Sequence, residues 1–112
     1  MTDTKRIYWA AFKTFGTDLQ LAVAIEEMAE LTKALCKEQR TIFTARMGCG
    51  DAKVGNLAQI AEEIADVQIV LEELTQLYDV AKKVQEIRKQ KLARLEMRIE
   101  KAREARGDNH AD

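Results

Sequence analysis

The chain has 112 residues, a formal net charge of −1 at pH 7, 33% charged residues and no Pro. This length predicts a single domain, and the composition favours long helices. No apolar run approaches the roughly 18 residues of a membrane span, the N-terminus has no signal core, and two cysteines are too few for a disulfide framework, so we expect a cytoplasmic protein without a membrane partner.

Apolar residues recur at helical spacing in four segments, and strand-like alternation is absent. The predicted helices cover roughly 3–14, roughly 18–39, Asn56 to about Tyr78, and roughly 80–105. Gly16 ends the first helix, and the three glycines of Thr41–Gly55 predict a loop after the second. Short connections elsewhere favour antiparallel neighbours. We therefore predict an all-α fold, a four-helix antiparallel bundle, with residues 1–106 as one domain and 107–112 as a polar tail.

Charge is unevenly distributed along the chain. Residues 82–106 carry ten Lys/Arg and four Glu, a balance of +6, whereas the rest carries eight basic and fifteen acidic residues, a balance of −7. The two parts either complement each other or face one ligand that contains metal and phosphate. Acidic helices beside the basic segment argue against a nucleic-acid partner.

The second and third predicted helices contain a near-repeat. Residues 25–31 read Ile-Glu-Glu-Met-Ala-Glu-Leu, and residues 61–67 read Ala-Glu-Glu-Ile-Ala-Asp-Val. Both follow the pattern apolar, acid, acid, apolar, Ala, acid, apolar. The repeat therefore places two acids at the same spacing, three residues apart, on each helix: Glu27 with Glu30, and Glu63 with Asp66.

A turn of about 100° per residue places these four acids on the apolar arcs of their helices. Glu26 and Glu62, by contrast, point towards the polar sides. Like charges three residues apart repel each other, and the repulsion grows with burial. Protonation, basic partners or a metal must therefore neutralise them. Four hard oxygen donors suit Mg²⁺ or Mn²⁺, and a structural cluster paired with Arg and Lys of the last helix is the alternative.

At these residues the chain resembles the MazG-like, all-alpha nucleoside triphosphate pyrophosphohydrolases. Their hallmark is an ExxE pair on one helix and an ExxD pair on the next, matched here by Glu27-Met28-Ala29-Glu30 and Glu63-Ile64-Ala65-Asp66. The likeness extends over about residues 12–100 and includes Lys91–Arg98 of the last helix. One departure is the long separation of the two motifs, whose excess lies in the Thr41–Gly55 segment.

The resemblance implies a Mg²⁺-dependent hydrolase, with Mn²⁺ as a possible substitute, that cleaves a nucleoside triphosphate to a monophosphate and pyrophosphate. It implies that Glu27, Glu30, Glu63 and Asp66 are the metal ligands and the catalytic set. It further implies that Lys91, Arg98 and the neighbouring Arg94 bind the substrate's phosphates, and that the chain forms a homodimer or homotetramer.

The chain lacks the residues that several other kinds of active site require. The chain has no Ser, and its only histidine is His110 in the tail, which argues against a serine nucleophile and against zinc or di-iron sites. Gly48–Gly55 lacks the Gly-Lys-Ser/Thr ending of a phosphate-binding loop. The remaining alternative is a non-enzymatic helical oligomerisation module that associates through an apolar seam on the last helix, which Lys91 interrupts.

Overall fold

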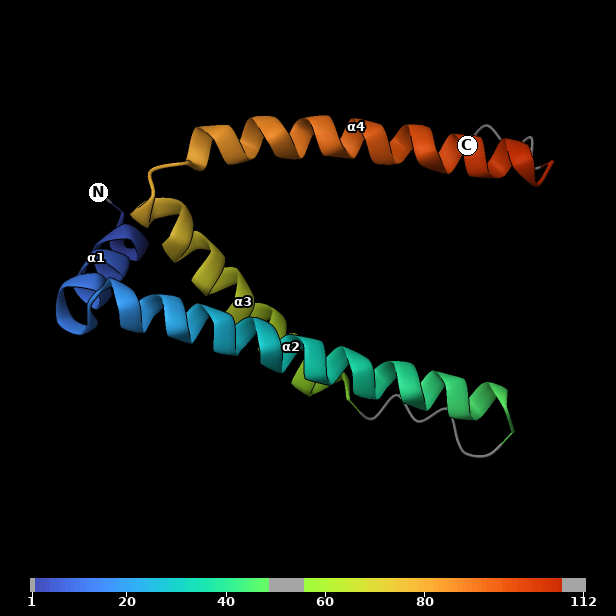
Figure 1. Ribbon diagram of the computed structural model, residues 1–112, viewed down its shortest axis with the longest axis horizontal. Helices are drawn as coiled ribbons and strands as arrows, with labels where there is room; N and C mark the ends of the chain where they lie inside the picture. Colours follow the sequence, from blue (N-terminus) through green and yellow to red (C-terminus); the bar gives the residue numbers. More distant parts are fainter. Residues whose placement is uncertain (1, 49–55, 108–112) are drawn as a thin grey trace. The chain divides into compact units, whose positions relative to one another are not determined.

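The computed structural model describes residues 2–48 and 56–107, and within these ranges it contains four helices and no strand (Figure 1). The helices are α1 (Asp3–Phe15), α2 (Thr17–Arg46), α3 (Leu57–Leu77) and α4 (Ala81–Ala105). The chain divides into two units, Met1–Leu77 and Tyr78–Asp112. The predicted all-α class and its four helices are confirmed, and α1, α2 and α3 pack on one another within the first unit.

The main difference from the predicted elements is the length of α2. This helix continues to Arg46, so the segment 41–46, predicted as loop, is helical. The reason is that the three glycines lie at positions 48, 50 and 55, and nothing before Gly48 breaks the helix. The rest of the predicted loop, residues 49–55, and the tail residues 108–112 lie outside the described residues.

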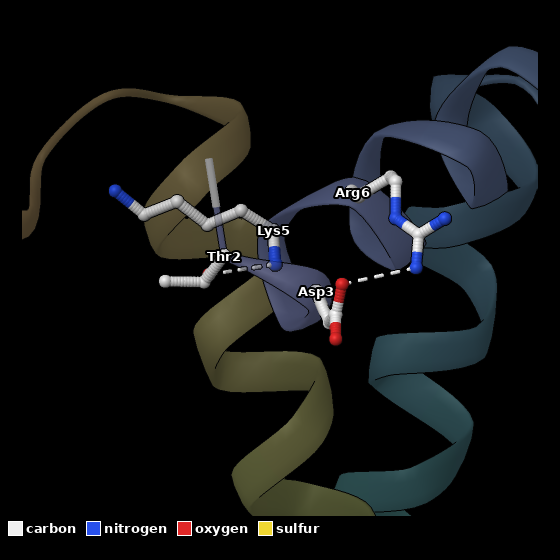
Figure 2. Close-up of polar contacts among 4 residues, drawn as sticks. All are labelled: Thr2, Asp3, Lys5 and Arg6. Carbon is white, nitrogen blue, oxygen red and sulfur yellow. Dashed lines mark hydrogen bonds and ion pairs between the residues drawn. The ribbon is translucent and has the colours of Figure 1, made fainter.

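The first helix has well-defined ends. Thr2 is its N-cap, and the Thr2 side-chain oxygen accepts a hydrogen bond of 3.2 Å from the backbone N–H of Lys5 (Figure 2). One turn along, Arg6 Nη2 lies 3.0 Å from Asp3 Oδ1, an exposed ion pair that adds little stability. Gly16 ends the helix with a φ of 84°, a conformation that glycine adopts without strain.

The contact between α2 and α3 follows a heptad pattern. Buried or half-buried residues recur in alternating steps of four and three on α2 (Gln20, Ala24, Glu27, Leu31, Ala34) and on α3 (Asn56, Ile60, Glu63, Val67, Val70, Leu74, Leu77). The Asn56 side-chain amide at the start of α3 donates a 3.4 Å hydrogen bond to the carbonyl of Ala34 late in α2. The two helices are therefore antiparallel, and their contact resembles a short coiled coil. We call these twelve positions the seam.

Helix α1 closes one end of this hairpin. The buried Tyr8 donates its hydroxyl hydrogen bond to Glu72 Oε2 of α3. Gln76 of α3 donates a 3.0 Å hydrogen bond to the backbone carbonyl of Lys5. Phe12, also buried, makes an edge-to-face contact with Trp9, with ring centroids 5.9 Å apart. These contacts hold α1 against the C-terminal half of α3 and away from the middle of the hairpin.

The second unit consists of α4 and the residues around it. Asp79, just before the helix, has a φ of 52° in the left-handed region, where Asp is among the few side chains tolerated. Every described residue of α4 is exposed. None of the helices in the described ranges combines the length and the hydropathy that crossing a membrane requires.

Candidate metal centre

Three of the four predicted acids meet in the middle of the α2–α3 hairpin. Glu27 and Glu63 both occupy seam positions, where a coiled coil normally has apolar side chains. The antiparallel direction, fixed by Ala34 beside Asn56, brings these two residues to the same level of the hairpin. Asp66 follows Glu63 by about one helical turn on the same helix.

The carboxylates of these three residues form a compact cluster. One oxygen from each of Glu27, Glu63 and Asp66 can be chosen so that all three lie within 4.8 Å of one another, and all three residues are half-buried. Oε2 of Glu63 is buried and has no hydrogen-bond partner among the described residues. A buried acceptor without a donor lowers the stability of the fold. A cation or a proton bound at Glu63 Oε2 would remove this cost.

The electrostatics of the cluster agree with its geometry. Burial raises the pKa of Glu27, and the charge of Asp66, a hydrogen bond with Asp66 and the charges of Glu63 and Glu26 raise it further. Burial also raises the pKa of Glu63, with added contributions from the charges of Asp66, Glu30 and Glu62. Both carboxyls are therefore harder to ionise than a free glutamate, because each loses solvent and gains negative neighbours.

The fourth predicted ligand, Glu30, stands apart from the cluster. Its side chain is exposed, and it is not one of the three acids that share the 4.8 Å group. Glu30 borders the cluster, because it lies about one helical turn after Glu27, and its charge contributes to the raised pKa of Glu63. The predicted outward orientation of Glu26 and Glu62 agrees with the structure, in which both are exposed.

The predicted phosphate-binding residues Lys91, Arg94 and Arg98 lie on α4, in the second unit. All three are exposed. The acid cluster is built wholly from the first unit, and the substrate role of these basic residues stays a prediction.

The apolar arcs of the separate helices do not predict the seam, although the spacing of its positions carries a signal for it. The steps of four and three run without interruption from Gln20 through Ala34 and continue to Glu38, Thr41 and Ala45. The shared heptad spacing of the two helices predicts that Glu27 faces Glu63, which the angles on each separate helix do not. It also explains Gln20, which is 8% exposed and lies one heptad before Glu27.

Two helices thus present three hard oxygen ligands to one small volume, an arrangement that can hold a divalent cation such as Mg²⁺. The cluster contains no histidine or thiol, so softer transition metals find no preferred ligands in it. Comparison with protein-family models, curated proteins and solved structures finds no match to this chain. Function is therefore inferred from the residues and their geometry.

Proposed function

We propose that this protein is a Mg²⁺-dependent nucleoside triphosphate pyrophosphohydrolase that acts as a homo-oligomer. The observation that carries the proposal is the meeting of Glu27, Glu63 and Asp66 at the seam, with their ligand oxygens within 4.8 Å of one another. A coiled-coil seam gains stability from apolar residues. Two glutamates that face each other there reduce stability, so a ligand that neutralises them accounts for their presence better than folding does.

The residues suit an ion that remains partly hydrated. Magnesium usually keeps several waters and takes one or two carboxylates together with substrate phosphates. The half-buried triad offers carboxylate oxygens on one side, and Glu30 at its border supplies a further acid whose ligand role the motif implies. Bound there, the ion would supply neutralisation of the phosphate chain and a more acidic water.

The chain's own residues would do the rest of the work. Glu27, Glu63 and Asp66 would fix the ion's position from two rigid helices, which orients the triphosphate relative to the attacking water. Phosphoryl transfer needs mainly positioning and charge neutralisation, so no covalent nucleophile is required. The choice of the α-phosphate as the point of attack comes from the resemblance of the two acidic motifs.

The decisive experiment is hydrolysis of a panel of nucleoside triphosphates in ¹⁸O-labelled water with Mg²⁺. Label in the monophosphate, with pyrophosphate as co-product, is the expected result. Label in orthophosphate with diphosphate as co-product would exclude the proposed bond cleavage. A chain that self-associates but releases neither product would instead favour the non-enzymatic oligomerisation module.

Variants of adjacent glutamates provide the matched control. Glu63→Gln should abolish turnover, because it removes a charge at the seam, whereas Glu62→Gln, on the exposed neighbour, should retain activity within a fewfold of the wild type. Circular dichroism of both variants checks that the helices persist. The predicted phosphate contacts are tested separately with Lys91→Met and Arg98→Met, which should raise KM or lower kcat without changing metal-dependent stability.

A further inference from the structure

Gln20 is a buried polar residue at a seam position, where an apolar side chain would pack better. It is 8% exposed, and its side-chain amide has no hydrogen-bond partner among the described residues. A buried amide without partners lowers the stability of the fold. Its atoms are not completely enclosed, in contrast to Glu63 Oε2, so a ligand can contact them. Gln20 is therefore explained better by a ligand than by packing.

Gln20 is aligned with the acid cluster along the seam. It lies one heptad before Glu27, which is about 10 Å along the axis of α2. The antiparallel register that brings Glu27 to the level of Glu63 brings Gln20 to the level of Val70. Two successive levels of the seam thus contain polar groups without partners, carboxylates at one level and an amide at the other.

Glu73 adds a carboxylate to the level of Gln20. It follows Asp66 by one heptad, so its position relative to Gln20 is the same as that of Asp66 relative to Glu27. Asp66 and Glu27 share a hydrogen bond, so side chains at this spacing can bind one common group. Glu73 is half-buried, burial raises its pKa, and it has no hydrogen bond with any described residue. Gln20 and Glu73 therefore form a second polar pair one heptad from the acid cluster.

Helix α1 supplies aromatic side chains close to this pair. The pKa of Tyr8 is raised to about 12 by burial and by Glu72, and the charge of Glu73 adds to the shift, so Glu73 lies near the Tyr8 hydroxyl. Trp9, the next residue, is 37% exposed and contacts Phe12 edge to face. Aromatic rings of this kind stack on nucleobases, whichever the base. Discrimination among bases must come from polar groups.

The polar pair has the hydrogen-bonding groups that distinguish one class of base. The Gln20 amide both donates and accepts, whereas the Glu73 carboxylate only accepts. Adenine and cytosine present an amino group beside a ring nitrogen that accepts a hydrogen bond, and this edge matches a carboxylate next to an amide donor. Uracil, thymine and guanine have a carbonyl oxygen in place of that amino group, and the oxygen would face the carboxylate.

We propose that Gln20 and Glu73 recognise the base of the substrate and select triphosphates of adenine and cytosine. Glu73 accepts a hydrogen bond from the amino group of the base, and the Gln20 amide donates to the neighbouring ring nitrogen. The phosphates lie one heptad away at the acid cluster, so a single ligand supplies partners to both levels of the seam. This inference rests on the proposed function, because it takes a nucleoside triphosphate as the ligand.

The test measures binding without turnover. Analogues of ATP, CTP, GTP and UTP in which a methylene group replaces the oxygen between the α- and β-phosphates are titrated calorimetrically into the full chain with Mg²⁺. The ATP and CTP analogues should bind at least about tenfold more tightly than the other two, the effect of one hydrogen bond. Gln20→Met should abolish this preference, and Glu73→Gln should shift it towards UTP and GTP, because an amide can donate to their carbonyl oxygens.

Exposed residues of the same types serve as controls. Gln39→Met on α2 and Glu62→Gln on α3 should leave the preference unchanged. Equal affinities of the wild type for all four analogues, or a preference that persists in both Gln20→Met and Glu73→Gln, would overturn the proposal. Circular dichroism checks the fold of each variant, and Glu73→Gln carries the test if Gln20→Met fails to fold.

Two further measurements separate this role from packing and from the proposed reaction. Gln20→Met should raise the melting temperature and bind inorganic tripolyphosphate as the wild type does, while it loses the base preference. A higher melting temperature with the preference intact would mean that Gln20 only packs, and the proposal would be wrong. Hydrolysis of the natural triphosphates is assayed in parallel. Selective binding without hydrolysis would remove the proposed reaction alone, and hydrolysis without selective binding would remove the base recognition alone.

Discussion

Magnesium should raise the melting temperature of this protein, and the expected size follows from linkage between binding and folding. The carboxylates of Glu27, Glu63 and Asp66 meet only in the folded chain, so an ion held by them would bind the folded state and not the unfolded one. At a hundred times its dissociation constant, such a ligand stabilises by about 2.7 kcal/mol. For a domain of this size 1 kcal/mol moves the melting temperature by about 4–8 °C, which predicts a rise of roughly 10–20 °C.

The rise should shrink as the pH falls. The pKa values of Glu27 and Glu63 are raised, by burial first and by neighbouring acids second, so a bound ion must displace protons at acidic pH. Each displaced proton lowers the apparent metal affinity by about tenfold per pH unit below the pKa of its group. Thermal melts recorded by circular dichroism at about pH 8 and about pH 5, each with a Mg²⁺ and a Mn²⁺ titration, measure both effects.

Adjacent residues again supply the control. Glu63→Gln should lose the metal-dependent rise in melting temperature, and Glu62→Gln should keep it. Of these two residues, only Glu63 contributes an oxygen to the cluster. Melting that is insensitive to millimolar metal at the higher pH would refute the site. An undiminished rise in Glu63→Gln would show that the ion binds elsewhere on the acidic surface.

Three further predictions concern stability. The folded state holds the Glu27 and Glu63 protons more tightly than the unfolded chain does, so the metal-free protein should lose stability as the pH rises from about 4.5 towards neutrality, and Glu63→Gln should flatten this dependence. Tyr8 has its pKa raised to about 12 by burial and by Glu72, so stability should fall between pH 10.0 and about 12, and Tyr8→Phe should cost about 1 kcal/mol in denaturant melts. Val70→Ala, at a buried seam position, should cost about 2 kcal/mol in the same assay.

The sequence predicts the elements well because each helix carries its own periodic signal. It predicts correctly that Glu27, Glu63 and Asp66 point towards the contact between the helices and are half-buried. The reason is that a residue's angle on its helix decides whether it lies on the apolar arc. The same angles also place Glu30 on the apolar arc, and this prediction is wrong because Glu30 is exposed. Its offset of about 80° from the seam places it at the edge of the contact, and only the position of α3 decides that such an edge residue reaches solvent.

Other features of the structure cannot be predicted from the sequence pattern of a single helix. The three glycines of residues 41–55 predict a loop over the whole segment, but α2 extends to Arg46, because the first of these glycines is Gly48 and no residue before it breaks the helix. The bond between Tyr8 and Glu72 joins residues 64 positions apart, and nothing local to either residue signals it. The pairing of Glu27 with Glu63 needs the register of the hairpin, which the link from Asn56 to Ala34 supplies.

Stability and the candidate site compete for the same seam positions in this protein. Apolar residues at positions 27 and 63 would extend the coiled-coil contact between Ala24 and Ala34 on α2, and between Ile60 and Val67 on α3. Acids at these positions remove that packing and leave Glu63 Oε2 buried without a donor among the described residues. The loss falls on a unit whose described residues include few buried side chains, so further stability must come from outside the hairpin. A cation held by Glu27, Glu63 and Asp66 would supply part of it, because it would neutralise the carboxylates that weaken the seam and would bind the folded hairpin alone.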